Sequence, residues 1–239
     1  MQRWRQLGGD LRQARASWIL VLLLCGAQVV VAEVGQPDWI YEKFGLSREG
    51  ILDGRGWQLL THAFLHGPWW IYWWHLVINA VCLLMAGVRV ERIGSAKVLS
   101  RAFLAGVLGG GIVQLLVTPD AGQILIGASG GLFAVMFWLL AIHSGEKMWP
   151  IPLKGRNLAL GLLIAEMGIV VTAWIWPESG LGMIGSGCHV GGAMAGWYLG
   201  RKSLGPRLTK EDLMRDRARR EGALQEKEKG PSAHGERAP

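Results

Sequence analysis

Four polar side chains in this 239-residue sequence are of the types that carry out acyl transfer. Ser129 stands among small residues in the stretch "GASGG", and His189 opens the stretch "HVGGAMAG". His75 and Asn79 are spaced i and i+4, which places both on one face of a helix. A serine hydroxyl becomes a nucleophile when a histidine accepts its proton, and amide, imidazole and backbone N–H groups can stabilise the resulting oxyanion. The pattern therefore predicts nucleophilic catalysis, with Ser129 as nucleophile, His189 as general base and acid, and His75 and Asn79 as oxyanion donors.

These residues belong to a strongly apolar chain. Hydrophobic residues make up 51% of it and 13 residues are tryptophan, far from the balance of a soluble domain of this size. Runs of about 18 to 20 apolar residues with few charges are long enough to cross a bilayer as helices. Six such runs predict an all-α, polytopic membrane protein, a bundle of six transmembrane helices at residues 17–34, 69–88, 98–117, 124–142, 158–176 and 181–199. The first run is too long for a removable signal peptide, and we expect it to stay as a helix.

Basic residues favour the cytoplasmic side of a membrane, so their placement predicts the orientation of the spans. They are concentrated in the N-terminal segment and in the second and fourth connections: Arg3, Arg5, Arg12, Arg15, Arg89, Arg92, Lys97, Arg101, Lys147, Lys154 and Arg156. The first connection offsets its basic residues with acids, and the third and fifth contain no basic residue. We therefore expect both the N and C termini to be cytoplasmic. The predicted domains are a cytoplasmic N-terminal segment (1–16), a six-span domain (17–200) and a polar, charged, partly disordered cytoplasmic tail (201–239).

The predicted topology also gives each polar residue a depth, because an α-helix rises 1.5 Å per residue. Spans two, four and six all run inward from the outer face. Ser129 lies about five residues into the fourth span, roughly 8 Å deep, and His189 lies roughly 12 Å deep in the sixth. His75 lies about six residues into the second span, with Asn79 one turn deeper. The four side chains are thus expected to meet in one layer of the outer leaflet.

Glycines surround the serine and recur in the last span. The small residues of "GASGG" would let a substrate backbone and the neighbouring helices come close to Ser129. The sixth span has glycines at four-residue spacing: Gly192, Gly196 and Gly200. This spacing predicts a small-residue face along which spans four and six pack closely, which would bring Ser129 and His189 together.

The ordered set of "HLVIN" in the second span, "GASG" at the fourth and "HVGGAMAG" in the sixth resembles the rhomboid family of intramembrane serine proteases. The likeness covers residues 17–200. In that family the GxSG serine is the nucleophile, the sixth-span histidine is its base, and a second-span histidine and asparagine line the oxyanion site. The resemblance implies the same roles here for Ser129, His189, His75 and Asn79. It also implies that Glu91, in "VERIGS", is a structural tie in a cytoplasmic connection.

Three features depart from the family pattern, one of them Glu166 in the fifth predicted span. The stretch "GPWWIYWW" separates His66 from His75, and Gln58 stands where a tryptophan-arginine pair is common. The insertion is expected to alter the entrance to the second span. We interpret His62 and His66, near the outer interface, as hydrogen-bonded supports of the first connection.

Glu166 is an acid within the fifth predicted span, about ten residues from its outer end and therefore deeper than Ser129. Two interpretations stay open for it: a carboxylate partner for a histidine or, as we favour, a buried neutral or hydrogen-bonded acid. No acid is evident at the depth of His189. We therefore expect a two-residue dyad, with backbone or water contacts holding the imidazole.

The expected function is that of an intramembrane serine endopeptidase that cleaves transmembrane segments near the outer, extracytoplasmic face. The expected partners are the lipid bilayer and a membrane-protein substrate whose transmembrane segment is helix-destabilised; no nucleic acid is expected. The three cysteines form no CxxC pair and no cluster with histidine, so neither a metal nor a cofactor is predicted. The resemblance implies a multi-pass protein of the bacterial cytoplasmic (inner) membrane.

Two other classes fit the sequence less well. A small-molecule transporter would show paired broken helices in two related halves, and no such pair is evident. A proteolytically inactive rhomboid relative would lack the serine or the sixth-span histidine, and both are present.

Overall fold

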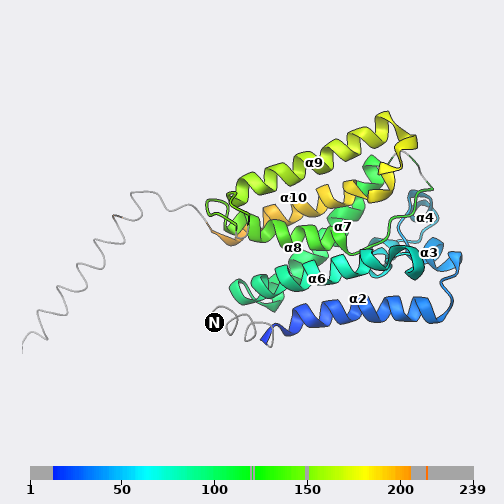
Figure 1. Cartoon of the computed structure of the whole chain (residues 1–239), viewed down its shortest axis with the longest axis horizontal. Helices are drawn as coiled ribbons and strands as arrows, with labels where there is room; N and C mark the ends of the chain where they lie inside the picture. The colour runs from blue at the N-terminus through cyan, green and yellow to red at the C-terminus, as the bar shows by residue number, and fades with distance from the viewer. Residues whose placement is uncertain (1–12, 119, 121, 149–150, 206–213, 215–239) are drawn as a thin grey trace, which may run out of the picture. The chain divides into compact units, whose positions relative to one another are not determined.

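A computed structural model describes residues 13–118, 120, 122–148, 151–205 and 214. Every regular element in this part of the chain is a helix, which confirms the all-α prediction there. Six longer helices form a bundle (Figure 1): α2 (Arg15–Glu33), α6 (Trp69–Ile93), α7 (Ala96–Val117), α8 (Ser129–Ile142), α9 (Gly155–Ile175) and α10 (Ser186–Ser203). Shorter helices lie in the connections: α3 (Asp38–Phe44), α4 (Arg48–Leu52), α5 (Gln58–Thr61), η1 (His62–Phe64), η2 (Pro177–Ser179) and η3 (Leu181–Ile184). The predicted N-terminal segment and tail lie mostly outside the described residues, so their boundaries stay predictions.

Three of the described helices, α2, α7 and α9, are long and apolar enough to cross a membrane, as judged by length and composition. Helix α8 is apolar but has 14 residues, so it is about 21 Å long. That is shorter than the hydrocarbon core of a bilayer, which is about 30 Å thick. The helices therefore indicate an integral membrane protein, while the count of six spans and the orientation of the termini stay predictions.

The starts of the fourth and sixth predicted spans are wrong. Helix α8 begins at Ser129, five residues after the predicted Ile124, and α10 begins at Ser186 after the short helix η3. The preceding segment is extended because Leu125 exchanges two backbone hydrogen bonds with Leu46, with N···O distances of 2.7 and 2.9 Å. These bonds satisfy backbone groups that an exposed extended segment would leave unpaired in lipid.

The predicted small-residue face of the sixth span is confirmed. A side chain at Gly192 would collide with the backbone of Gly130, and one at Gly196 would collide with the backbone of Ala134. Helix α7 joins the same contact, because a Cβ at Gly110 would lie 2.6 Å from the carbonyl oxygen of Cys188. Since only residues without a side chain allow backbones to approach this closely, the glycines hold α7, α8 and α10 together.

The largest apolar core lies among α2, α6, α7 and α8. Its fully buried members include Leu24, Leu83, Leu99, Val135 and Trp138. Other large apolar side chains point outward, such as Leu22 (63% exposed) and Ile164 (62% exposed). Rows of exposed aliphatic residues on α2 and α9 are the surface expected against lipid tails.

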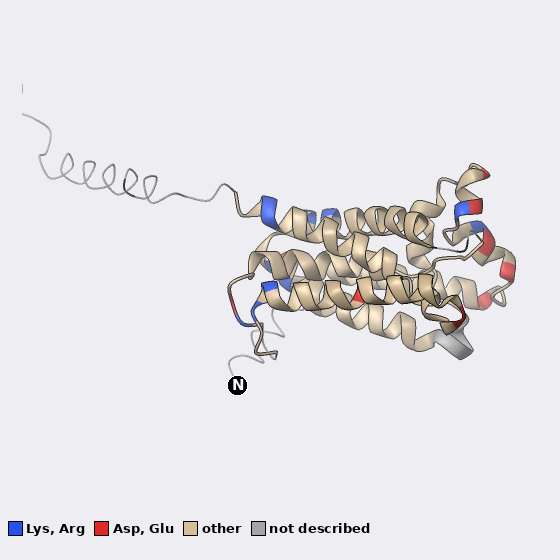
Figure 2. Ribbon diagram, turned by 90° about the horizontal axis from the view of Figure 1, so that it is seen from above, with Lys and Arg blue, Asp and Glu red and all other residues tan. Residues whose placement is uncertain are grey.

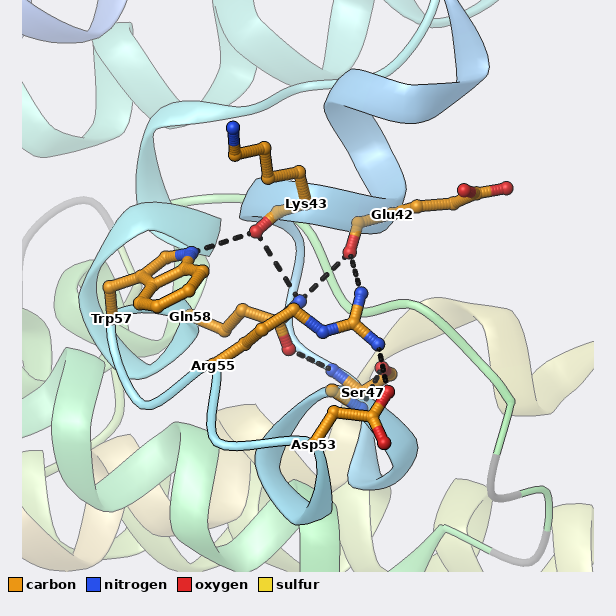
Figure 3. Close-up of polar contacts among 8 residues, drawn as sticks. Glu42, Lys43, Ser47, Asp53, Arg55, Trp57 and Gln58 are labelled. Carbon is orange, nitrogen blue, oxygen red and sulfur yellow. Dashed lines mark hydrogen bonds and ion pairs between the residues drawn. The ribbon is translucent and has the colours of Figure 1, made fainter.

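The connection between α2 and α6 is held by polar contacts (Figure 3). Buried Gln58 donates from Nε2 to the carbonyl of Glu42 at 2.9 Å and accepts at Oε1 from the backbone N–H of Ser47 at 3.3 Å. The Trp57 indole donates to the carbonyl of Lys43 at 2.9 Å, and Arg55 donates to the Glu42 carbonyl at 3.0 Å. Gln58, which departs from the family pattern, is therefore an internal support of this connection.

Glu91 ties the end of α6 to the start of α2, as the resemblance implied. Its carboxylate accepts hydrogen bonds from the backbone N–H groups of Ala16 and Ser17, both at 3.0 Å, and from the Ser17 hydroxyl at 2.9 Å. The first N–H groups of a helix have no partner within it, so these bonds stabilise the beginning of α2.

Charged residues divide between the two ends of the bundle (Figure 2). Lys and Arg gather at the end where α6 and α10 finish, with Arg92, Arg201 and Lys202 in their last turns. The opposite end carries most of the acids in the described part of the chain, including Asp38 and Glu49 in the first turns of α3 and α4. This asymmetry agrees with the placement of basic residues used to predict the orientation.

Candidate catalytic site

Ser129 is the first residue of α8, and a tight turn positions it. Gly127 has φ = +112°, a conformation that side chains rarely adopt, and a Cβ there would lie 2.7 Å from Cε1 of His75. The Gly127 N–H donates to the carbonyl of His62 at 2.9 Å, and the Ala128 N–H donates to Nε2 of His66 at 3.4 Å. The first connection therefore fixes the backbone that leads into the serine.

His189 is the fourth residue of α10 and faces the start of α8. Its Nε2 is 2.9 Å from Oγ of Ser129, a hydrogen-bond distance between residues on different helices. The imidazole also stacks on Phe133, with ring centroids 4.2 Å apart and an interplanar angle of 4°. Phe133 is four residues after Ser129, so one face of α8 presents both the hydroxyl and the aromatic ring to the imidazole.

The other side of the imidazole meets an acid, contrary to the expected dyad without an acidic partner. Nδ1 of His189 is 3.0 Å from Oε1 of Glu166, and the two side chains are only 11% and 15% exposed. The distance is that of an ion pair, while the angle at Nδ1 falls outside that of a good hydrogen bond. Of the two interpretations of Glu166, the structure favours the carboxylate partner of a histidine.

His75 and Asn79 lie beside the turn, on α6. The His75 ring packs against Gly127 and is near enough to His189 for their charges to interact. Asn79 is 2% exposed, and its Nδ2 donates to the carbonyl of His75 at 2.9 Å. Its Oδ1 is buried without a hydrogen-bond partner in the described part of the chain. The structure thus brings His75 to the "GASG" turn. The hydrogen bond of the Asn79 side chain is to another residue of α6 and not to that turn.

His62 and His66, which lie outside the membrane-spanning helices, support the site from the first connection, as predicted. His62 Nδ1 is 2.8 Å from the carbonyl of Gln58, and the His66 N–H donates to Oε1 of Gln28 at 3.1 Å. Burial lowers the pKa of His62 to about 4, against a smaller opposing effect of the bond to Gln58. Burial, together with the nearby charge of His75, lowers the pKa of His66 to about 3. Both rings are therefore neutral at physiological pH.

The sequence analysis missed the contact between Phe133 and His189, and it did not favour a contact between Glu166 and a histidine. The i+4 spacing from Ser129 was a signal for Phe133, because it predicts a shared helix face. The signal for Glu166 was an acid in an apolar span, which needs a partner.

These contacts define the class of the protein: a helical membrane protein in which a serine at a buried helix start meets a histidine from another helix. A family model, the Rhomboid domain, matches residues 53–205. The chain belongs to the rhomboid family.

Curated relatives agree with this assignment. The chain is 26% identical over 155 residues to RHOMBOID-like protein 5 of Arabidopsis thaliana, an alignment that covers 65% of this chain and 46% of the relative. It is 24% identical over 147 residues to Rhomboid-related protein 2 of Mus musculus (60% and 47%) and 29% identical over 149 residues to Rhomboid-related protein 3 of Homo sapiens (61% and 34%). The chain spans about half the length, or less, of these relatives.

Proposed function

We propose that the chain is an intramembrane serine endopeptidase in which Ser129 and His189 form the reacting pair. The observation that carries the proposal is the 2.9 Å contact between Ser129 Oγ and His189 Nε2. The two side chains come from separate helices whose backbones approach through glycines. A pair of this kind, mostly shielded from solvent, has the geometry that a serine nucleophile and its base require.

The reaction begins when Ser129 Oγ attacks the carbonyl carbon of a peptide bond and its proton moves to His189 Nε2. When the tetrahedral intermediate collapses, the C–N bond breaks and His189 returns that proton to the leaving amine. Water then attacks the acyl-enzyme and gives a proton to His189. The second intermediate releases the carboxylic acid, and Ser129 recovers its proton.

The oxyanion of each intermediate needs donors that are already in place. The N-terminal N–H groups of α8, which begin at Ser129, have no partners within the helix and carry the positive end of its dipole. His75, against the turn at Gly127, and Asn79, one turn further along α6, are the proposed side-chain donors. The Asn79 amide nitrogen carries two N–H groups, and the bond to the His75 carbonyl uses only one of them.

The proposed substrate is a membrane protein with a transmembrane segment that unwinds readily. A regular helix hides its carbonyl groups in its own hydrogen bonds, so glycine, proline or polar residues near the cut favour attack. The charge asymmetry of the bundle supports cytoplasmic termini. Six spans and a site in the outer half of the membrane complete the proposal. We extend the proposal to a bacterial cytoplasmic membrane, although the relatives named above are eukaryotic.

Labelling of the purified full-length protein with a fluorescent fluorophosphonate tests the proposal. The wild-type chain should react at Ser129, Ser129→Ala should abolish the signal, and His189→Ala should reduce it to a small residual rate. Ser100→Ala, at an exposed position on α7, is the matched control and should label as the wild type does. Equal labelling of Ser129→Ala would show that the nucleophile is wrongly assigned.

The oxyanion donors are tested by cleavage of a fluorogenic transmembrane peptide with a small residue near its external end. Loss of one donor typically lowers turnover about 100- to 1,000-fold. His75→Ala and Asn79→Ala should slow cleavage in this range while the proteins remain folded. Wild-type rates in both variants would assign these residues to structure instead.

A further inference from the structure

Glu166 is an acid in the middle of an apolar membrane helix. It lies nine residues before the end of α9, and its side chain is 15% exposed. A carboxylate at this depth is unfavourable unless a partner compensates its charge. The ion pair that the structure gives it is with His189, at 3.0 Å.

The surroundings of the carboxylate point to the same partner. The Ser186 hydroxyl, three residues before His189 on α10, faces Glu166. That hydroxyl and Glu166 Oε2 are both buried without a hydrogen-bond partner in the described part of the chain. The groups that face the His189 ring from the packed helices are Ser129 and Phe133 of α8, His75 of α6 and Glu166 of α9. Glu166 is therefore the one anion among these neighbours.

The imidazole has two nitrogens with different tasks. Nε2 faces Ser129 and must lack a proton to accept one from the hydroxyl. The proton of the neutral ring must then stay on Nδ1, the nitrogen that faces Glu166. A carboxylate beside Nδ1 favours this tautomer and stabilises the imidazolium that forms when the serine is deprotonated.

We propose that Glu166 is a positioning residue that holds His189 in the tautomer and orientation needed to activate Ser129. This inference rests on the proposed function and extends it from a dyad to a serine–histidine–glutamate arrangement. The Nδ1 proton remains on the ring throughout, and Glu166 stays ionised while the catalytic proton moves between Oγ, Nε2 and the leaving amine. The contact, poorly angled in the resting protein, tightens when the ring becomes charged.

The test is the second-order rate constant of fluorophosphonate labelling at Ser129, measured across pH on the full chain in detergent. This probe reports the nucleophile directly and needs no natural substrate. The variants are Glu166→Gln, which keeps the shape without the charge, and Glu166→Asp, which keeps the charge on a shorter side chain. Glu178→Gln, at an exposed acid of η2, is the matched control.

Glu166→Gln should lower the rate constant about 10- to 1,000-fold, less than the roughly 10⁴-fold seen for the acid of a fully hydrogen-bonded triad. Its rate–pH profile should move to lower pH on the acid side, because the imidazolium loses its anionic neighbour while His75 remains. Glu166→Asp should restore part of the rate, and Glu178→Gln should match the wild type. In a His189→Ala background, Glu166→Gln should change the residual rate less than twofold, because Glu166 acts through the histidine.

A folded Glu166→Gln protein with the wild-type rate and pH profile would overturn the proposal. If Glu166→Gln does not fold, Glu166→Asp decides: a slowed rate with a displaced profile supports the proposal, and a wild-type rate and profile overturn it. A wild-type chain that is not labelled at Ser129 contradicts the proposed function itself, and the role of Glu166 falls with it.

Discussion

Replacement of Gly192 by alanine is expected to part α8 from α10 and to slow the reaction of Ser129. A Cβ at Gly192 would overlap the carbonyl oxygen of Gly130 and lie 2.9 Å from its carbonyl carbon. Carbon atoms in contact need about 3.5–4.0 Å. Because the obstructing atoms are all backbone, no change of side-chain rotamer can make room, and the helices must separate locally by roughly 1 Å.

This separation would lengthen the distance between Ser129 and His189. Gly130 follows Ser129, and Gly192 is three residues after His189, so the displacement adds to the 2.9 Å between Oγ and Nε2. A distance near 3.9 Å exceeds the hydrogen-bond range by about 0.7 Å. Misplacement of about 1 Å can slow a reaction roughly 100-fold, and overpacking of a tight interface destabilises by about 1–3 kcal/mol. We expect labelling to slow about 10- to 100-fold and the unfolding temperature to fall.

Gly168→Ala on α9 is the matched control, because a Cβ at Gly168 meets nothing within 4 Å. Alanine is favoured over glycine in a helix by about 1 kcal/mol, so this variant should label normally and unfold at the same temperature or higher. Labelling rates and thermal unfolding are measured on the three proteins in one detergent. The reasoning is refuted if Gly192→Ala labels at the wild-type rate and is as stable as Gly168→Ala.

Three further outcomes are expected. Glu91→Ala should lower the free energy of unfolding by about 2 kcal/mol, because three hydrogen bonds to the start of α2 are lost, without changing the labelling rate of the folded fraction; equal stability in denaturant titrations would contradict this. The free energy of unfolding should fall as the pH is lowered from 7.5 to 5.5. In the unfolded chain His62 and His66 have the ordinary pKa of about 6.5 and bind protons in this range, whereas in the folded protein their pKa values are about 4 and about 3 and both rings stay neutral. The two rings together should lower the free energy of unfolding by roughly 2–3 kcal/mol over this range. A free energy of unfolding that does not change with pH, or the same pH dependence in a His62→Asn variant, would rule this out. A substrate with its N terminus outside should be cut in the outer third of its span, and N-terminal sequencing of the retained fragment would expose the error if the cuts cluster in the cytoplasmic half.

The contact between Ser129 and His189 was predictable because each residue stands in a sequence stretch with its own signal. A serine among glycines and a histidine that opens a glycine-rich helix have few roles in an apolar span other than close packing and reaction. The glycine spacing also predicted which helices meet, and the backbone collisions expected at Gly192 and Gly196 confirm that interface. Helical periodicity carries this information because a shared face depends only on residue spacing.

The hydrogen-bond network of the first connection could not be read from the sequence in the same way. The contacts of Gln58 with the backbone of Glu42 and Ser47 depend on how three short helices turn. Such turns follow no period, and their backbone partners carry no residue-specific signal. The sequence indicated that His62 and His66 support this region, but not that they hold the backbone at Gly127 and Ala128.

The depth of Glu166 shows why counting residues along a predicted span misled. The count assumed helical rise from Ile124, which put Ser129 roughly 8 Å below the start of its span. Residues 124–128 are not helical: Leu125 pairs with the backbone of Leu46, and the chain then turns at Gly127, whose φ is +112°. Glu166, nine residues from the end of α9, is about 14 Å along its helix. Counting helical rise from Ile124 therefore could not rank the depths of Ser129 and Glu166, and the 3.0 Å contact with His189 Nδ1 shows that the acid lies beside the histidine.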